Sequence, residues 1–218
     1  IYETLRKSFV AELDGNIIEA PEAITRLLRL QQVLCGWFSG EEGIQQIDDK
    51  NARLEALKEI LALTEAKRRL DLQDEAQNKF MPFAHHVYEN FIEGRHHRVI
   101  AEKLEAVARG ELKRLIINMP PRHSKSEFAS YLMPAWFLGR NPKLKIIQAT
   151  HNTELAVRFG RKVRDLIDDP AYREIFPETN LKEDNKGAGK WGTDKGGEYF
   201  AAGVGAAVTG RGADLFVI

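Results

Sequence analysis

A short polar segment between two apolar stretches carries residue types that bind phosphate. It reads MPPRHSKSE over residues 119–127 and places Lys125 beside Ser126. A lysine ammonium neutralises phosphate charge, and a serine hydroxyl can ligate a magnesium ion. Arg122 and His123 add positive charge and hydrogen-bond donors. The segment therefore has side chains suited to binding a polyphosphate.

The spacing of this segment departs from the usual phosphate-binding loop. That loop reads G-x-x-x-x-G-K-[ST], follows a strand and opens a helix, and its backbone N–H groups point at the phosphates. Lys125 and Ser126 fit the last two positions, whereas Met119 and Ser124 occupy the glycine positions. Two prolines after Met119 restrict φ and offer another way to hold a tight turn. A solvated turn whose basic residues face water is the alternative.

Size and composition limit the possible classes of protein. A chain of 218 residues can bury one sizeable core, or a compact α/β domain with a small helical appendage. Lysine plus arginine equals aspartate plus glutamate at 32 each, so no whole-chain field attracts nucleic acid or a membrane. The single cysteine, Cys35, argues against a disulfide scaffold. Because neither a membrane span nor a secretory signal is visible, we expect a soluble cytoplasmic protein without membrane contact.

The second part of the chain alternates between two kinds of pattern. Apolar runs predict strands over 115–119, 144–150, 198–204 and 215–218, and helical spacing predicts helices over 99–107 and 153–169. Asn152 or Thr153 can cap the helix over 153–169, and Pro170 closes it. Phe128 and Trp136 belong to an apolar face on the segment after the loop. This alternation predicts an α/β fold with a mainly parallel sheet and flanking helices.

The first part of the chain is expected to be helical. Apolar spacing predicts one helix from Pro21 to Leu34 and another through Leu54 to Leu61, with a glycine-marked break from Gly36 to Gly43. A charged stretch over 65–81 suits an exposed helix or a connector. The expected organisation is therefore a helical segment over 1–64, a charged linker over 65–81 and an α/β part over 82–218.

Three stretches carry a family resemblance. They read GRHHRVIAEKLEAVARGELKRLIINMPPRHSKSE, IIQATHNTELAVRFGRKVRDLIDDPAYREIFPET and KWGTDKGGEYFAAGVGAAVTGRGADLFVI. From about Pro82 to Ile218 the chain resembles the large terminase subunit of tailed bacteriophages and prophages. That protein is an ATP-driven motor that packages viral DNA into a capsid and cuts DNA with a separate nuclease domain.

The resemblance implies a role for each residue of the loop. In this family a deviant Walker A segment of the form P-P-R-H-[GS]-K-S cradles the phosphates of ATP. Lys125 would contact the β and γ phosphates, Ser126 would ligate Mg2+, and Arg122 would contact the transition state. The implied nucleotide-binding residues are Pro120, Pro121, Arg122, His123, Ser124, Lys125 and Ser126.

The resemblance also implies a P-loop NTPase fold and a set of partners. Residues 215–218 would be the Walker B strand, and we expect its acidic residues, with the nuclease domain, to lie beyond Ile218. These 218 residues would then bind ATP weakly and neither hydrolyse it nor cut DNA without the rest. The implied partners are double-stranded DNA, a small terminase subunit, the capsid portal and further copies in a ring. The implied location is the cytoplasm of the bacterial host and, transiently, the procapsid.

The start of the chain supports a different interpretation. AITRLLRLQQVLCGW followed by DDKNARLEALKEIL resembles the linker into the second motor lobe of Swi/Snf-type helicases. A fragment of a helicase or remodelling ATPase is therefore one alternative. A catalytically silent α/β binding protein is another, because the loop lacks its glycines.

Other polar residues admit both a functional and a structural interpretation. The pairs His85–His86 and His96–His97 lack the spacing of a zinc site. Phe83, His96 or His97 could stack on an adenine, as residues before the first motor strand do in similar ATPases. Arg158, Arg161, Lys162 and Arg164 could follow a DNA backbone or form a solvated helix face. Arg211 could contact DNA or a neighbouring subunit from a turn, and Trp191 is expected to anchor a loop.

Overall fold

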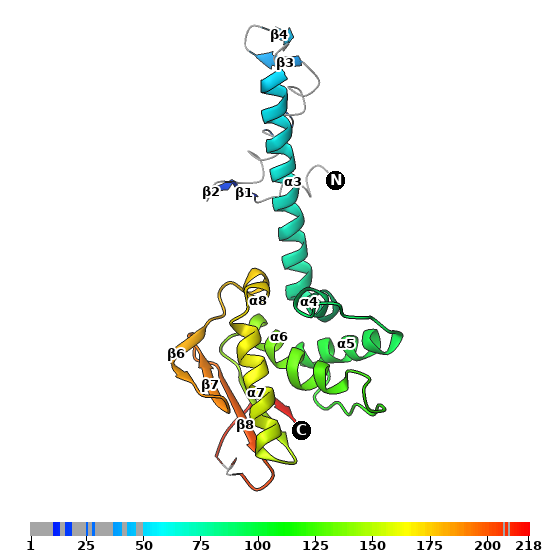
Figure 1. Ribbon diagram of the computed structural model, residues 1–218, viewed down its shortest axis with the longest axis vertical. Helices are drawn as coiled ribbons and strands as arrows, with labels where there is room; N and C mark the ends of the chain where they lie inside the picture. The colour runs from blue at the N-terminus through cyan, green and yellow to red at the C-terminus, as the bar shows by residue number, and fades with distance from the viewer. Residues whose placement is uncertain are drawn as a thin grey trace. The chain divides into compact units, whose positions relative to one another are not determined.

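The structure is a computed structural model that divides into two compact units, Ile1–Leu72 and Gln73–Ile218 (Figure 1). It describes residues 50–218 except 207 and 209, together with residues 11–13, 16–18, 25, 28, 37–40 and 43–46. Cys35 and most of the helix predicted over 21–34 lie outside the described residues. Thr25 and Leu28, which belong to that prediction, are helical and exposed.

The described part of the first unit contains two hairpins and most of one long helix. Strand β1 (Ala11–Leu13) pairs antiparallel with β2 (Asn16–Ile18), and β3 (Trp37–Gly40) pairs antiparallel with β4 (Gly43–Gln46). The second hairpin corrects the prediction of a simple break at these glycines. Glycine here marks the reversal between two strands, which is a common use of its conformational freedom.

Helix α3 (Lys50–Asn78) includes both the helix predicted over 54–61 and most of the charged stretch after it. Exposed ion pairs at helical spacing run along that stretch, such as Arg68 Nη2 to Glu65 Oε1 at 2.9 Å. The last turn of α3 belongs to the second unit. There the indole Nε1 of Trp136 donates a hydrogen bond of 2.9 Å to the backbone oxygen of Ala76.

The second unit is built on a five-stranded sheet in the order β6-β7-β8-β5-β9. Its strands are β5 (Lys145–Thr150), β6 (Leu181–Lys186), β7 (Lys190–Thr193), β8 (Glu198–Gly203) and β9 (Leu215–Val217). Strand β5 pairs parallel with both β8 and β9, whereas β6–β7 and β7–β8 are antiparallel. The sheet is thus mixed, which corrects the prediction of a mainly parallel one. The antiparallel edge of the sheet was not predicted, because β6, LKEDNK, carries almost no apolar residues that would mark it as a strand.

Six helical segments accompany the sheet. They are α4 (Phe80–Val87), α5 (Arg95–Ala108), η1 (Glu127–Leu132), α6 (Met133–Arg140), α7 (Thr153–Ile167) and α8 (Pro170–Ile175). The capping prediction for α7 is confirmed, because the Asn152 side chain accepts a hydrogen bond of 2.8 Å from the N–H of Leu155. Pro170 follows the end of α7 and also occupies the first turn of α8, where its missing N–H costs nothing.

Helix α7 lies against the sheet at a close backbone approach (Figure 1). A Cβ placed on Gly160 would lie 2.8 Å from the backbone oxygen of Ala188 and 3.0 Å from the Tyr199 ring. The oxygen of Gly160 accepts a hydrogen bond of 3.0 Å from the buried Trp191 indole, which stacks on Tyr199. Trp191 is therefore an anchor, but it lies on strand β7 and ties helix α7 to the sheet, whereas the sequence predicted that it anchors a loop.

Residues 115–119, predicted as the strand that precedes the loop, do not join the sheet. Their burial alternates as a strand's does: Leu115, Ile117 and Met119 pack against the core, whereas Ile116 is 86% exposed. The alternation specifies which face is buried, but a strand also needs a neighbour for its backbone groups. Because no described strand supplies that neighbour, the predicted strand is wrong as a member of the sheet.

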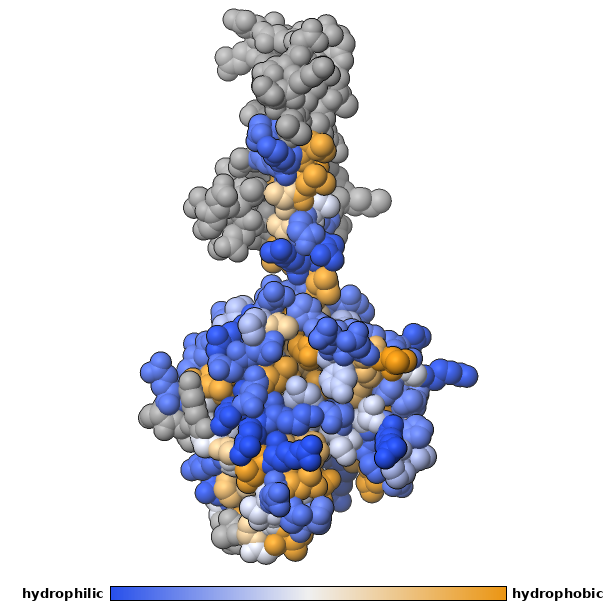
Figure 2. Space-filling model, viewed as in Figure 1, coloured by the Kyte–Doolittle hydropathy of each residue, from blue (hydrophilic) through white to orange (hydrophobic). Residues whose placement is uncertain are grey.

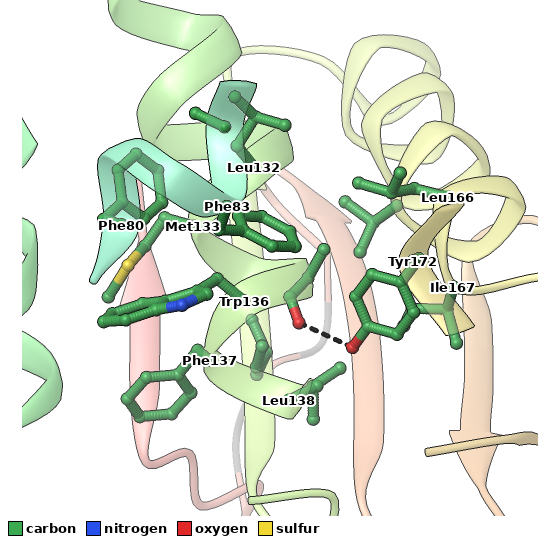
Figure 3. Close-up of a cluster of buried hydrophobic side chains, with 14 of the residues drawn as sticks. Phe80, Phe83, Leu132, Met133, Trp136, Phe137, Leu138, Leu166, Ile167 and Tyr172 are labelled. Atoms are coloured by element: carbon green, nitrogen blue, oxygen red, sulfur yellow. Dashed lines mark hydrogen bonds between the residues drawn. The ribbon is translucent and has the colours of Figure 1, made fainter. Parts of the chain in front are cut away.

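Aromatic side chains pack together with aliphatic ones in the core of the second unit (Figure 3). Phe80 of α4 meets Trp136 of α6 edge to face, with ring centroids 5.5 Å apart. Tyr172 of α8 lies under the same helix, and its hydroxyl donates a hydrogen bond of 2.9 Å to the oxygen of Ala135. Helix α6 is thus held from two sides.

The face of the second unit shown in Figure 2 is covered mainly by hydrophilic residues, with smaller apolar patches between them. Among the described residues, no helix combines the length and the apolar character needed to cross a membrane.

The buried Tyr172 hydroxyl gives a test of this core. Replacing Tyr172 with phenylalanine removes its hydrogen bond to Ala135 and keeps the ring, so we expect a loss of about 1 kcal/mol of unfolding free energy. Urea denaturation followed by circular dichroism measures it. The matched control, Tyr88→Phe, alters a tyrosine that is 37% exposed and should change stability by much less. Equal effects for the two variants would contradict this packing.

Candidate functional site

The loop over 120–124 leads directly into a helix that begins at Lys125. Two of its residues, Arg122 with φ 64° and Ser124 with φ 59°, adopt the left-handed conformation that glycine adopts easily. Each such residue costs about 1–2 kcal/mol, so the surrounding structure must hold it in place. The loop thus forms a tight turn without the usual glycines, and Ser124 takes a positive φ at a position where glycine was expected.

The helix that follows presents its N-terminus to this loop. The first intrahelical bond runs from the N–H of Phe128 to the oxygen of Ser124 at 2.9 Å, which leaves the preceding N–H groups without intrahelical acceptors. Such groups, together with the helix dipole, favour an anion at that end. The helix is wide over η1, where the N–H of Met133 donates to the oxygen of Phe128. Pro134 explains the wide turn, since proline cannot donate and clashes with the carbonyl four residues earlier.

The cationic side chains of the loop are exposed and differ in their contacts. The Lys125 Nζ reaches back across the turn to the oxygen of Met119 at 3.4 Å. His123 is fixed by its Nδ1, which lies 2.9 Å from the oxygen of Pro121. Within the part of the chain that the structure describes, the Arg122 guanidinium and the Ser126 hydroxyl have no hydrogen-bond partner. These side chains are therefore available to a ligand.

An ion pair attaches the start of this helix to α7. The Lys162 Nζ lies 2.9 Å and 3.1 Å from the two carboxylate oxygens of Glu127, and it also lies over the Tyr131 ring at 4.4 Å. Burial, with the charge of Glu127, raises the pKa of Tyr131 to about 12. Lys162 is therefore occupied in a structural contact rather than free to follow a DNA backbone.

Three histidine rings gather beside the loop. His96 and His97 of α5 have centroids 3.8 Å apart, and His123 of the loop lies 5.8 Å from His96. His97 is only 5% exposed and stacks on Phe128, with ring centroids 5.0 Å apart. Sequence analysis singled out His96 and His97 but did not bring His123 to them. Only the packing of α5 against η1 makes them one cluster.

The protonation of His97 is constrained by its neighbours. The N–H of Gly94 donates to its Nδ1 at 2.9 Å, so a neutral His97 carries its proton on Nε2. Burial, followed by the charge of His96, lowers the pKa of His97. The Nε2 atoms of His96 and His97 are both buried without a hydrogen-bond partner in the structure.

The structure separates the other predicted site residues. Phe83 is fully buried and packs on Tyr172 and Phe176, so the prediction that it could stack on a base is wrong. Arg211 is held over the Phe200 ring at 4.1 Å and bonded to Glu198 at 3.2 Å, rather than projecting from its turn.

The arginines of α7 do not form one continuous surface. Arg164 contacts Asp165 at 2.7 Å, and Lys162 is engaged as described, whereas Arg158 and Arg161 are exposed. Two of the four cations proposed to contact DNA therefore remain accessible on this helix.

A polar cavity of about 550 Å3 lies elsewhere, lined by residues of α3, α6 and the α8–β6 connection, including Gln77, Arg140 and Thr179. No sequence pattern pointed to it, because its lining comes from three separate segments. Among the described residues, no group of three or more histidine, cysteine, aspartate or glutamate side chains is arranged to hold a metal ion.

Comparison with protein-family models, with curated proteins and with solved structures gave no match to this chain.

The positive φ of Ser124 predicts the effect of a glycine at this position. Ser124→Gly should raise the unfolding free energy by up to about 1 kcal/mol, because the left-handed conformation costs glycine nothing. Urea denaturation checks this. The reciprocal control is Gly110→Ala, at φ 76°, where an added Cβ would meet no other atom within 4 Å; it should destabilise by a similar amount. Destabilisation by Ser124→Gly would contradict this loop geometry.

The lowered pKa of His97 predicts a pH dependence of stability. The unfolded chain binds a proton more readily than the folded one, so stability is present above the unfolded pKa and is lost as pH falls through about 6.5. We expect the unfolding free energy to fall between about pH 7.5 and 5.5, and to fall less steeply in His97→Gln. Denaturant titrations at several pH values measure this, with the exposed His151→Gln as control. Equal slopes in the wild type and His97→Gln would refute the assignment.

Proposed function

We propose that this chain binds ATP through residues 120–126 and belongs to an ATP-driven motor of the large terminase type, with a P-loop NTPase fold. The observation that carries the proposal is the loop itself. A turn with two left-handed residues delivers a lysine and a serine into the first turn of a helix, as a phosphate-binding loop does.

The loop offers a triphosphate three kinds of contact. The free N–H groups at the helix start suit phosphate oxygens, and the helix dipole adds to the attraction. Lys125 would exchange its contact with the Met119 oxygen for the β and γ phosphates. The Arg122 guanidinium, in the same loop, would meet charge that develops during phosphoryl transfer.

Magnesium fits the proposal through Ser126. Its hydroxyl lies in the first helical turn, next to Lys125, and has no partner among the described residues. A bound Mg2+ would neutralise phosphate charge. Ser126 would hold the ion next to the lysine.

The wider function follows from the resemblance over residues 82–218. In a terminase motor, ATP hydrolysis would drive double-stranded DNA into a capsid, with a small terminase subunit and the portal as partners and a ring of motor subunits as the working form. Arg158 and Arg161 are the exposed cations on α7 that would be available to DNA. The work would take place in the cytoplasm of a bacterial host and at the procapsid.

Replacement of Lys125 tests the nucleotide site. Lys125→Ala should weaken binding of magnesium-ATP by at least about tenfold, since it removes the cation that faces the phosphates. Binding of a fluorescent ATP analogue, displaced by ATP, measures the loss. Lys143→Ala is the matched control, because it removes an exposed lysine from the turn before β5. Failure of the wild-type chain to bind, or equal affinity of Lys125→Ala, would favour a silent α/β binding protein instead.

A further inference from the structure

The three histidines beside the loop come from two different elements. His96 and His97 are neighbours on α5, and His123 belongs to the loop that would hold the phosphates. Adjacent positions on a helix normally point about a hundred degrees apart. Here the two rings nevertheless lie 3.8 Å apart between centroids, with His123 on the other side of His96. His96 therefore lies between a buried ring and a ring on the loop.

The surroundings of the buried histidine disfavour its charged form. His97 packs between Phe91 and Phe128, with centroids 4.8 Å and 5.0 Å away. Its Nδ1 accepts the N–H of Gly94 at 2.9 Å, so a proton there would break this bond. A charge on His97 would also lie next to His96. His97 is thus the part of the cluster least able to accept a proton.

The charges around the cluster are of both signs. Glu93, in the connection just before α5, is already bonded to Arg98 and to His85 at 2.7 Å. On the loop side the neighbours of His123 are the cations Arg122 and Lys125. A positive charge added on the loop side of the cluster would therefore lie beside existing cations, while Glu93 is engaged with Arg98 and His85.

A polyphosphate in the loop would reverse this balance. Its negative charge favours the protonated form of any imidazole within a few ångströms. His123 is a residue of the loop itself, and His96 lies next to it with a buried Nε2 that has no partner. A protonated imidazole donates from both ring nitrogens, so a proton gained here would also supply a further hydrogen-bond donor beside the loop.

We propose that His96 and His123 form a proton-linked phosphate clamp, in which binding of a polyphosphate to the loop is accompanied by uptake of a proton on one of these two rings. His97 is the neutral ring that positions His96. The inference rests on the proposed nucleotide site, and it adds a regulation of that site by pH.

The linkage has a definite sign. A group whose pKa is raised by the ligand binds a proton on complex formation, so affinity increases as pH falls through the bound-state pKa and levels off below the free-state pKa. For one proton the association constant rises by at most about tenfold per pH unit.

The test is calorimetric titration of the full chain with magnesium-ATP between about pH 6 and 8, in pairs of buffers with different ionisation enthalpies. The dependence of the heat on buffer gives the number of protons taken up. We expect net uptake by the wild-type chain and affinity that increases on acidification. In His123→Gln and His96→Gln both the uptake and the pH slope should be reduced.

Matched variants separate the possible results. His86→Gln removes a histidine of α4 that bonds to Glu174 at 3.1 Å, away from the loop, and should keep the wild-type uptake. Any proton taken up by the nucleotide itself appears equally in the titration of this variant, so the difference between variants excludes it. His123→Gln changes an exposed loop side chain, so it does not depend on the core staying intact.

Two outcomes would overturn the inference in different ways. If the wild-type chain binds magnesium-ATP with the same proton uptake as His123→Gln and His96→Gln, the clamp is refuted and the proposed nucleotide site stands. If the wild-type chain gives no binding at any pH, the nucleotide site fails and the clamp fails with it.

Discussion

The aromatic packing around the helix that follows the loop is the constraint on which the candidate site depends. Phe128 and Trp136, eight residues apart on that helix, are both buried, and both meet Phe80 edge to face at centroid distances of 5.3 Å and 5.5 Å. The Trp136 indole adds a hydrogen bond to Ala76 in the last turn of α3. Edge-to-face pairs of this kind contribute directional contacts beyond the apolar area that they bury. The helix is thereby fixed along its length, and its N-terminus has a defined place.

A fixed helix explains how the loop keeps its shape without glycine. Left-handed conformations at Arg122 and Ser124 each cost free energy, so they persist only where the flanking segments leave no alternative. One end of the loop joins the anchored helix, and the other follows Leu115, Ile117 and Met119, which pack on the same core. The Glu127–Lys162 ion pair adds a second attachment, from the start of the helix to α7. The same packing brings Phe128 under His97 and so places the histidine cluster next to the loop.

Local patterns predicted several elements well, and the reasons are local. Helix α7 has a capping asparagine before it and a proline after it, and its strong apolar periodicity needs no tertiary information. Strands β5, β8 and β9 are apolar runs that any buried strand would show. Strand β6 was not predicted because it is polar. Residues 115–119 were wrongly predicted as a strand of the sheet, because alternation of burial does not require a paired backbone. The balance of parallel and antiparallel pairs depends on how strands meet in space, which periodicity cannot specify.

The chemical groups that the site can offer follow directly from the amino-acid sequence. A lysine, a serine, an arginine and a histidine within residues 122–126 fix its charge and donors, and the prolines before them fix a turn. Tertiary structure alone decided which of these groups are available and what lies beside them. In the folded chain Lys162 forms an ion pair with Glu127, Phe83 is buried in the core, and the His96 ring lies next to the His123 ring. The physical reason is that a side chain's type is carried by the chain, whereas its charge state and its accessibility are set by neighbours that are distant in sequence.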